Sequence, residues 1–331
     1  MQSHSREATV CRADAAKPLV PNKYVSLVKK MYDGMECRVL LRGQITDPFE
    51  VKTGVRQGCL LSPFLFLLAV DWIMKQVTLE GRTGIQWTLT SHLEDLDFAD
   101  DLALLSHSHN HMQEKTDRLD KVSKSVGLNI HSGKTKILRI NTTAEQPITL
   151  RETPLEEVDS FMYLGSTINK EGGTDEDIRV RIQKARGAFI MLRNIWKTKV
   201  LRKETKLRIF RSNVKSVLLY GSESWKLNES AKNRLQVFIN KCLRQILGIR
   251  WFDLVTTEDL LTRANEQRVE EQITCRRWRW IGHTLRRPDS NIAKRALRWN
   301  PQGQRKEEDP GIPSDEKLSR VLVSLGNLGL N

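Results

Sequence analysis

Apolar positions along the chain change their spacing near residues 169–175. Beyond this point they recur every three to four residues, which is typical of helices, on stripes over 178–195, 207–217 and 235–246. In this part Gly248 is expected to end one helix, and Thr256 or Thr257 to begin a last long one. The pattern predicts a mixed α+β first half followed by a helical second half.

Helix and strand signals alternate in the first half. Helices are expected from Tyr24 to about Gly34, from Ser62-Pro63 to about residue 79, and over 112–126. Short strands are expected over 37–41, 49–52, 136–140 and 161–168, the last one interrupted at Gly165. Leu93–Ser106 predicts two strands with Asp100 and Asp101 at the turn between them.

Size and charge narrow the class of protein. The 331 residues suffice for about two domains, and 39% hydrophobic residues is typical of a folded chain. Lysine plus arginine number 54 against 40 acidic residues, and this charge of +14 favours a polyanion, either nucleic acid or an acidic membrane face. The longest apolar run, Phe64–Val70, is too short to span a bilayer. Scattered cysteines and the lack of signal-peptide character indicate an intracellular protein, nuclear or cytoplasmic.

The pair Asp100-Asp101 is the sharpest local feature. Adjacent carboxylates at a hairpin tip repel each other unless a cation lies between them, and carboxylate oxygens are ligands that suit Mg²⁺. An ordinary Asp-rich turn is the alternative, because aspartate side chains bond readily to turn backbone.

Three further segments carry candidate chemistry. Gly54–Pro63 places glycines, Arg56 and Gln57 just before a helix start, which suits the close approach of a phosphate; a plain turn before a buried helix is the alternative. Gly127–Lys136 puts Lys134 on a turn after a helix, and Tyr163–Ser166 fits a strand with a bulge. Taken alone, the last two segments are ordinary structure.

These four segments, in this order and at these distances, resemble the reverse transcriptase of non-LTR (LINE-type) retrotransposons, and among these most of all the RTE-type elements. The resemblance runs from about Tyr24 to Lys306 and includes Ala185–Trp196, Leu219-Tyr220-Gly221 with Trp225, and Trp280–His283. It implies an α+β fold with a divergent leader (1–23), a partial polymerase palm made of an antiparallel sheet with helices (24–170), an all-helical thumb-like region (171–250), a basic helical region (251–306) and a divergent tail (307–331).

The resemblance also implies roles for single residues. Asp100 and Asp101 would hold Mg²⁺ or Mn²⁺, with Asp100 the better candidate for direct ligation, and Lys134 would protonate the leaving pyrophosphate. The template and nucleotide would lie against the loop residues Arg56, Gln57, Gly58 and Ser62. Tyr163, Leu164 and Gly165 would form the primer grip. The implied reaction is in-line attack of a DNA primer 3′-hydroxyl on the α-phosphate of a deoxynucleoside triphosphate, directed by an RNA template.

One part of the family pattern has no counterpart in the sequence. A two-metal polymerase uses a further aspartate upstream of Gly54–Pro63, and Asp14, Asp33 and Asp47 do not fit its context. The fingers and an N-terminal endonuclease are not recognisable either, and Glu307–Pro310 is acidic where relatives continue basic. We therefore expect a truncated or degenerate reading frame that holds its metals weakly and polymerises at background, because metal assistance supplies a large part of the barrier reduction.

Residues 276–306 contain ten basic residues and one acidic residue, with Trp278, Trp280 and Trp299 between them. Arginine suits phosphate contacts and indole suits base stacking, although large aromatic side chains are more often packed inside a domain. The residues expected to contact nucleic acid are Arg276, Arg277, Arg279, Arg286, Arg287, Arg295 and Arg298. His107, His109 and His111 alternate, but without a further nearby ligand they favour a polar loop over a metal site.

Two other interpretations stay open. A non-catalytic module derived from the polymerase would bind nucleic acid through the basic surface, with an affinity that falls steeply with salt. A helical scaffold would use its charge for solubility or bind protein partners or acidic lipid, with no such affinity. The oligomeric state is not determined by the sequence.

Overall fold

The computed structural model describes residues 21–51, 54–56, 58–79, 82–86, 92–142 and 146–298. The chain divides into two compact units, and the boundary lies between Val158 and Asp159. The periodicity places the change of character later, near residues 169–175, so the strands just before that point belong to the second unit. Each unit is described by itself.

Three helices are described in the first unit: α2 (Asn22–Tyr32), α3 (Ser62–Val77) and α4 (His109–Ser125). The predicted start of α3 is confirmed, because Pro63 occupies the first turn, where a helix needs no N–H from it. The helix α4 begins three residues earlier than expected and includes His109 and His111. The prediction of a polar loop is therefore wrong for these two histidines. The start of the helix was missed because its first residues are polar and do not extend the apolar pattern by which a helix is recognised.

The strands of the first unit are short and pair two at a time. The antiparallel pairs are β1 (Glu36–Cys37) with β4 (Phe49–Glu50), β2 (Leu40–Leu41) with β3 (Gln44–Ile45), β5 (Ile85–Gln86) with β6 (His92–Leu93), β7 (Asp95–Phe98) with β8 (Asp101–Leu104), and β10 (Thr149–Leu150) with β11 (Thr153–Pro154). Strands β9 (Lys136–Ile137) and β12 (Glu156–Glu157) pair in parallel. Within the described ranges these pairs do not join into the continuous antiparallel sheet expected of a palm, and most strands are too short to extend one.

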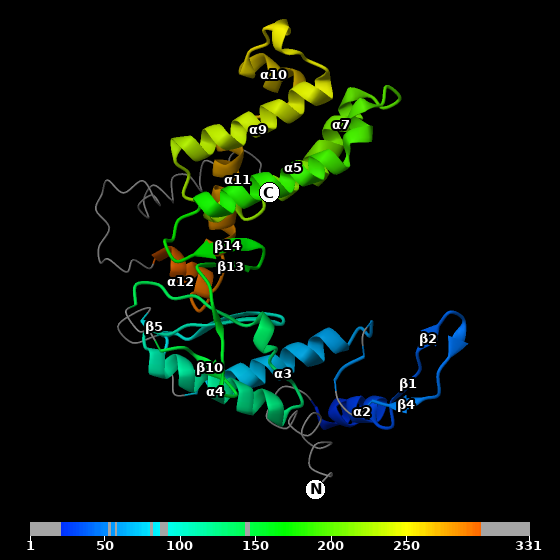
Figure 1. The fold of residues 1–331 in the computed structure, drawn as a ribbon, viewed down its shortest axis with the longest axis vertical. Coiled ribbons are helices and arrows are strands. Elements are labelled where there is room, and N and C mark those ends of the chain that lie inside the picture. Colours follow the sequence, from blue (N-terminus) through cyan, green and yellow to red (C-terminus); the bar gives the residue numbers. More distant parts are fainter. Residues whose placement is uncertain are drawn as a thin grey trace. The chain divides into compact units, whose positions relative to one another are not determined.

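The core of the first unit lies between α3 and α4, which run side by side (Figure 1). Val70, Ile73 and Met74 of α3 are buried there with Leu119 of α4. The two leucine side chains of β8 pack against the same cluster. This packing attaches the β7–β8 hairpin to the two helices.

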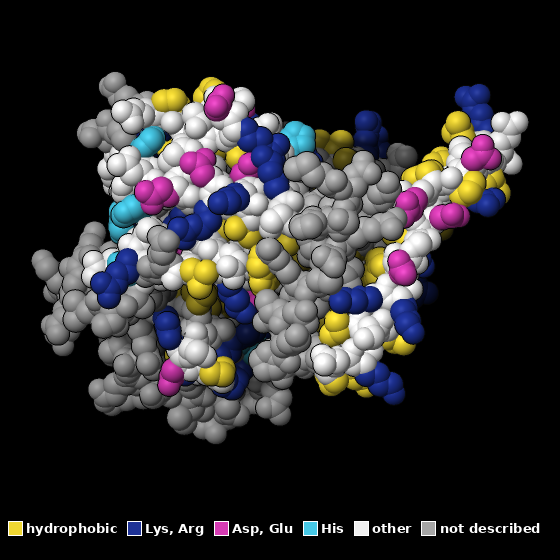
Figure 2. Space-filling view, turned by 90° about the horizontal axis from the view of Figure 1, so that it is seen from below, with side chains coloured by type: hydrophobic (Ala, Val, Ile, Leu, Met, Phe, Trp, Pro, Cys, Tyr) yellow, Lys and Arg dark blue, Asp and Glu magenta, His cyan; other side chains and the backbone are white. Residues whose placement is uncertain are grey.

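Other apolar side chains of the first unit remain open to solvent. No side chain of α2 is buried. Leu40, Leu41 and Ile45 of the β2–β3 hairpin are 69%, 67% and 64% exposed. Figure 2 shows such hydrophobic side chains interspersed with lysines and arginines on one face. These elements add little to the core, so the apolar burial of this unit comes from the α3–α4 pair and from a smaller cluster of residues 148–155.

The second unit begins with a hairpin of β13 (Ser160–Tyr163) and β14 (Ser166–Asn169) and continues as helices. In chain order these are α5 (Asp175–Met191), α6 (Arg193–Lys197), α7 (Lys203–Phe210), the π-helical turn η3 (Arg211–Lys215), α8 (Ser216–Leu218), the 3-10 turn η4 (Ser222–Ser224), α9 (Glu229–Leu247), the 3-10 turn η5 (Trp251–Asp253), α10 (Thr257–Ala264), α11 (Val269–Leu285) and α12 (Ile292–Arg298). Figure 1 shows α9 running along α5 and α7, with α10 at its end. None of the helices in the described part of the chain is both long and apolar enough to cross a membrane.

The apolar stripes predicted from the sequence fill the core of the second unit. Ile178, Phe210, Leu235 and Ile239, from three different helices, are each at most 1% exposed. Gly248 ends α9 in left-handed backbone (φ 73°), as predicted. These stripes therefore mark the helix faces that pack together.

Two expectations are wrong in this unit. Residues 161–168 form a hairpin rather than one interrupted strand, because Leu164 (φ 48°) and Gly165 (φ 81°) take left-handed backbone that reverses the chain. Thr256 does cap a helix, accepting a bond from the amide of Asp259 at 3.2 Å. The single long helix expected after it is instead three helices, since Asn265 (φ 49°) ends α10 in left-handed backbone.

Candidate functional site

The acidic hairpin β7–β8 carries Asp100 and Asp101 at its tip. Its turn is formed by Ala99 and Asp100, while Asp101 opens β8 and pairs with Phe98. Ala99 has a φ of 57°, a costly conformation for a residue with a side chain, and such strain concentrates at functional sites. Both aspartates are exposed, and no hydrogen bond or ion pair joins either carboxylate to another described residue. Two adjacent, uncompensated carboxylates offer the hard oxygen ligands that fit a divalent cation.

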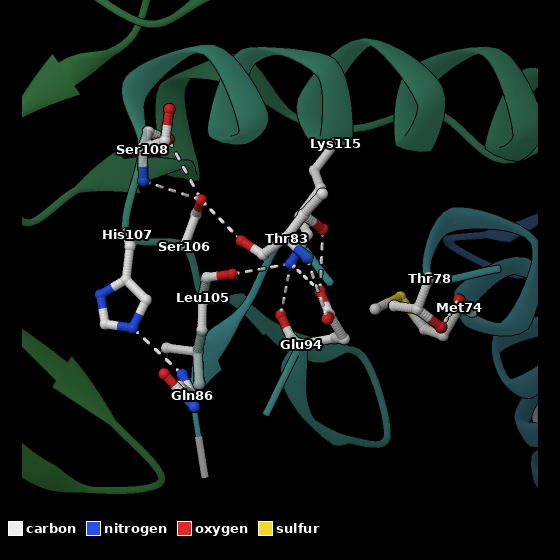
Figure 3. Close-up of polar contacts among 10 residues, drawn as sticks. All are labelled: Met74, Thr78, Thr83, Gln86, Glu94, Leu105, Ser106, His107, Ser108 and Lys115. Carbon is white, nitrogen blue, oxygen red and sulfur yellow. Dashed lines mark hydrogen bonds and ion pairs between the residues drawn. The ribbon is translucent and has the colours of Figure 1, made fainter. Parts of the chain in front are cut away.

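A buried lysine of α4 holds the base of this hairpin (Figure 3). The Lys115 side chain is 3% exposed, and its Nζ lies 2.5 Å from Oε2 of Glu94, the residue before β7. The same ammonium donates to the carbonyl of Leu105, just after β8, at 2.7 Å and to that of Glu94 at 3.1 Å. Lys115 thus bridges both strands of the hairpin and satisfies the carbonyls at their ends.

Further polar contacts extend this support. Burial disfavours the Glu94 carboxylate, but bonds from Lys115 and Thr83 outweigh it and hold the pKa of Glu94 below its ordinary value. Thr83 donates its hydroxyl to Glu94 at 2.9 Å and accepts the Ser106 hydroxyl on its carbonyl at 2.8 Å. His107 Nε2 accepts from the amide of Gln86 at 3.0 Å. Figure 3 shows these groups around the hairpin base, and the sequence patterns had identified none of these contacts.

Two more aspartates lie on the opposite face of the hairpin. In the ladder, Asp95 pairs with Leu104 and Asp97 with Leu102, so both share the face of the core leucines, whereas Asp101 lies on the other face. Burial, and next the neighbouring charge of Asp97, raise the pKa of Asp95 to about 6. Across the described residues, no group of three or more histidine, cysteine or acidic side chains is close enough to hold a metal ion.

The glycine-rich loop leads directly into α3. Ser62 is buried, and its hydroxyl donates to the carbonyl of Arg56 at 2.5 Å while lying 3.2 Å from the hydroxyl of Tyr32. Ser62 therefore shapes the loop from inside, whereas the Arg56 side chain is exposed. Gly58 adopts a φ of 81°, and Gln57 lies outside the described residues.

Cys59, in the same loop, is an ionisable group that the motif had not singled out. The amide of Leu61 is the main cause that lowers the pKa of its thiol. Lys134 is exposed on the 3-10 turn η2 (Ser132–Lys134), where its amide donates to the carbonyl of His131 at 3.0 Å. The first unit thus carries the acidic hairpin, this loop and the lysine, each on its own element.

The predicted primer-grip residues belong to the second unit. Tyr163 ends β13, and Leu164 and Gly165 form the tight turn to β14. The carbonyl of Leu164 accepts the Tyr220 hydroxyl at 3.1 Å. This hairpin is therefore mounted on the helices that follow it.

The arginines expected to contact nucleic acid fall into two groups. Arg276 and Arg277 are half-buried on α11 and donate to the backbone, Arg276 to the carbonyl of Leu219 at 3.2 Å and Arg277 to that of Glu223 at 3.3 Å. The more exposed members are Arg279, Arg286, Arg287 and Arg295. The side chain of Arg298 and all of Trp299 lie outside the described part, Trp278 is half-buried, and Trp280 is 40% exposed.

Comparison with known families identifies two segments of the chain. Residues 11–168 match the family described as reverse transcriptase (RNA-dependent DNA polymerase). This range includes the acidic hairpin, the glycine-rich loop, Lys134 and the Tyr163–Gly165 turn. Residues 188–220 match a family described only as a domain of unknown function.

Individual relatives are transposon proteins. An "uncharacterized transposon-derived protein" of Caenorhabditis elegans is 29% identical over 219 residues, covering 63% of this chain and 78% of the relative. The "probable RNA-directed DNA polymerase from transposon X-element" of Drosophila melanogaster is 25% identical and that from transposon BS is 26% identical. They cover 73% and 85% of this chain, which spans only 27% and 31% of their lengths.

Proposed function

We propose that this chain is the RNA-directed DNA polymerase segment of a non-LTR retrotransposon, because residues 11–168 match the reverse transcriptase family and relatives from two such transposons align with most of the chain. The proposed substrates are an RNA template, a DNA primer and deoxynucleoside triphosphates. The observation that carries the proposal is the strained hairpin tip, where two uncompensated carboxylates lie inside the matched range. The RTE-type affiliation is a finer proposal and depends on the motif set alone.

The residues of the first unit have distinct roles in this proposal. Asp100 and Asp101 would hold Mg²⁺ or Mn²⁺, and such ions, when bound, stabilise the attacking and leaving oxygens of phosphoryl transfer. Lys134, exposed and cationic, would deliver a proton to the pyrophosphate that departs. Arg56 and the open backbone at Gly58 would lie against the template and the nucleotide, with Ser62 holding the loop in shape.

In this proposal the palm consists of the first unit together with the β13–β14 hairpin that begins the second unit, and the thumb consists of the helices that follow. Residues 24–170 correspond to the palm, with Tyr163–Gly165 as primer grip, and residues 171–250 to the thumb. Residues 251–306 would add a basic surface for the nucleic-acid backbone. The helical character of the second unit and its exposed arginines support this assignment.

We further propose that this chain polymerises weakly by itself. A two-metal site uses a carboxylate that bridges both ions, and in the described ranges no third ligand group joins Asp100 and Asp101. When such a ligand is lost, the rate falls tenfold for about every 1.36 kcal/mol of transition-state stabilisation that is lost with it.

Primer extension with the full chain tests the weak-activity proposal and, where incorporation is seen, the role of Asp100. We expect incorporation at background with either Mg²⁺ or Mn²⁺, and no further change in Asp100→Ala. Incorporation above background that disappears in Asp100→Ala would overturn the weak-activity proposal and support the assignment of Asp100. Incorporation that persists in Asp100→Ala would contradict the role of the hairpin.

A second candidate function is a nucleic-acid-binding module without catalysis. The exposed arginines of α11 and α12 favour it, because they do not depend on the acidic hairpin. A steep fall of primer–template affinity with salt, combined with extension at background in every metal, is the result expected of this module. Absence of binding at low salt would remove both candidates and favour the scaffold interpretation.

A further inference from the structure

The segment Leu219–Trp225 has no role in the reaction proposed above, although its Tyr-Gly and Trp residues form a recognisable motif. In the structure it lies beside the β13–β14 hairpin, within the second unit. Its contacts converge on the turn that carries Tyr163, Leu164 and Gly165.

Both carbonyl groups of the turn are held by side chains of the helical region. The Tyr220 hydroxyl donates to the carbonyl of Leu164 at 3.1 Å, and the Arg181 guanidinium of α5 donates to the carbonyl of Gly165. The same guanidinium lies over the Tyr220 ring, 4.4 Å from its centroid. One arginine and one tyrosine thus hold each other and the turn.

The second strand of the hairpin is fixed by a buried carboxylate. Asp177 accepts from the amide of Thr167 at 3.0 Å and from the indole N–H of Trp225 at 2.8 Å. Asp177, Arg181 and Trp225 are 4%, 5% and 2% exposed. Because Asp177 and Arg181 are four residues apart, one face of α5 holds both the turn and the strand.

Two glycines lie where the hairpin closely approaches the helical region. A Cβ on Gly165 would lie 3.2 Å from Nη2 of Arg181, and one on Gly221 would lie 3.2 Å from Oγ of Ser166. Both glycines have positive φ, at 81° and 71°. A side chain at either position would strain the backbone and would displace the neighbouring Arg181 or Ser166 side chain by a few tenths of an ångström, so glycine favours this close approach.

Two features of these contacts indicate that they orient the Tyr163–Gly165 turn and do not only stabilise the fold. Nε of Arg181 is buried and has no hydrogen-bond partner within the described residues, although it lies 3.9 Å from Oδ1 of Asp177, so the guanidinium is oriented toward the carbonyl of Gly165 and not toward the carboxylate. Tyr220 is 52% exposed, so its hydroxyl bond contributes little to folding yet reaches the tip of the turn.

We propose that Arg181, Asp177, Tyr220 and Trp225 are positioning residues for the primer strand, acting by locking the Tyr163–Gly165 turn to the helices. This inference rests on the proposed function, because it takes this turn as the contact for the primer end. The role that it gives to the Tyr-Gly and Trp motif is to hold the β13–β14 hairpin in position. Arg276 and Arg277 of α11 donate to backbone carbonyls within the Leu219–Trp225 segment and so help to hold this segment in place.

The test compares Tyr220→Phe with the full-length wild-type chain. Fluorescence anisotropy measures Kd for a labelled DNA primer annealed to an RNA template, and for the single-stranded template alone. We expect Tyr220→Phe, which removes one hydrogen bond, to weaken primer–template binding about fivefold and to leave template binding unchanged. Tyr24→Phe, at an exposed tyrosine of the first unit, is the matched control and should change neither.

Arg181→Lys provides a second variant, because lysine keeps the charge but cannot reproduce the fork of the guanidinium. Unfolding temperature is recorded for each variant, and should change little in Tyr220→Phe. If the wild type binds both ligands and Tyr220→Phe changes neither Kd, or changes both by the same factor, this inference is overturned while the proposed function stands. Absence of primer–template binding by the wild type overturns the proposed function, and the inference falls with it. If Arg181→Lys does not fold, the result for Tyr220→Phe decides.

Discussion

Carboxylates with different surroundings lie within one short hairpin. Asp100 and Asp101 face solvent at its tip, whereas Asp95 shares the opposite face with Leu104 and the α3–α4 core. An alternating Asp-Leu-Asp-Phe sequence cannot show which carboxylate is buried. Register decides it, because each cross-strand pair shares one face.

The buried position of Asp95 predicts a dependence of stability on pH. Its folded pKa of about 6 lies above its ordinary value of 3.8, so between these values the native state binds more protons than the unfolded state. Its contribution to stability is therefore greatest below pH 4 and declines as the pH rises through 6. At pH 7 we expect Asp95→Asn to raise the free energy of unfolding by about 1–2 kcal/mol, a value reduced for solvent screening.

Urea unfolding of both proteins at pH 4 and pH 7 checks this prediction. Asp47→Asn, on an exposed loop of the same unit, is the control and should leave the difference between the two pH values unchanged. A stabilisation by Asp95→Asn that is equal at both pH values would show that Asp95 is not the titrating group.

At the scale of elements, the hairpin β7–β8 depends on a helix that is distant in sequence from its base. Lys115 compensates a buried carboxylate and two carbonyls at once. Lys115→Met removes this cation and leaves Glu94 buried and unpaired, so we expect a loss of about 3–5 kcal/mol of stability. Urea unfolding followed by circular dichroism measures it.

Two further variants define the origin of that loss. Lys124→Met, on the same helix but in a more exposed ion pair with Asp120, should cost at most about 1 kcal/mol. Combining Lys115→Met with Glu94→Gln should recover part of the loss, since no buried charge then lacks its partner. If the double variant is no more stable than Lys115→Met, the ion pair is not what supports the hairpin.

At the scale of the whole molecule, the arginines near the C-terminal end divide between structure and solvent. Arg286 and Arg287 follow α11 and are exposed, whereas Arg277 is bound to backbone carbonyls. We expect Arg286→Ala combined with Arg287→Ala to reduce the slope of log affinity against log salt by about 2, because each phosphate contact contributes nearly one. Binding to primer–template at a series of salt concentrations measures this slope.

Arg277→Ala is the contrasting variant. It should lower the unfolding temperature while leaving the salt slope unchanged, because its guanidinium is already bound to the carbonyls of Glu223 and Trp225. A fall in slope equal to that of the double variant would place Arg277 on the nucleic acid instead.

Long, strongly periodic segments could be predicted from the sequence, and sites built from distant polar residues could not. The starts of α3 and α10 and the end of α9 follow from proline, threonine and glycine, whose effects are local. The hairpin at 160–169 was predicted as one strand because non-glycine Leu164 gives no turn signal. The pair Lys115–Glu94 and the bond from Arg181 to the carbonyl of Gly165 gave no pattern at all, since Lys115 and Arg181 each resemble a solvated helix position when taken alone.

The sequence by itself determined which helix faces of the second unit are buried, where the carboxylate pair lies, and that the chain carries excess positive charge. Spacing and composition suffice for these properties because they depend on near neighbours. Tertiary structure alone decided which charges are buried, which arginines are bound to the backbone, and how the turn at Leu164 is held. These properties depend on contacts between residues more than ten positions apart, and such contacts form only when the packed helices bring those residues together.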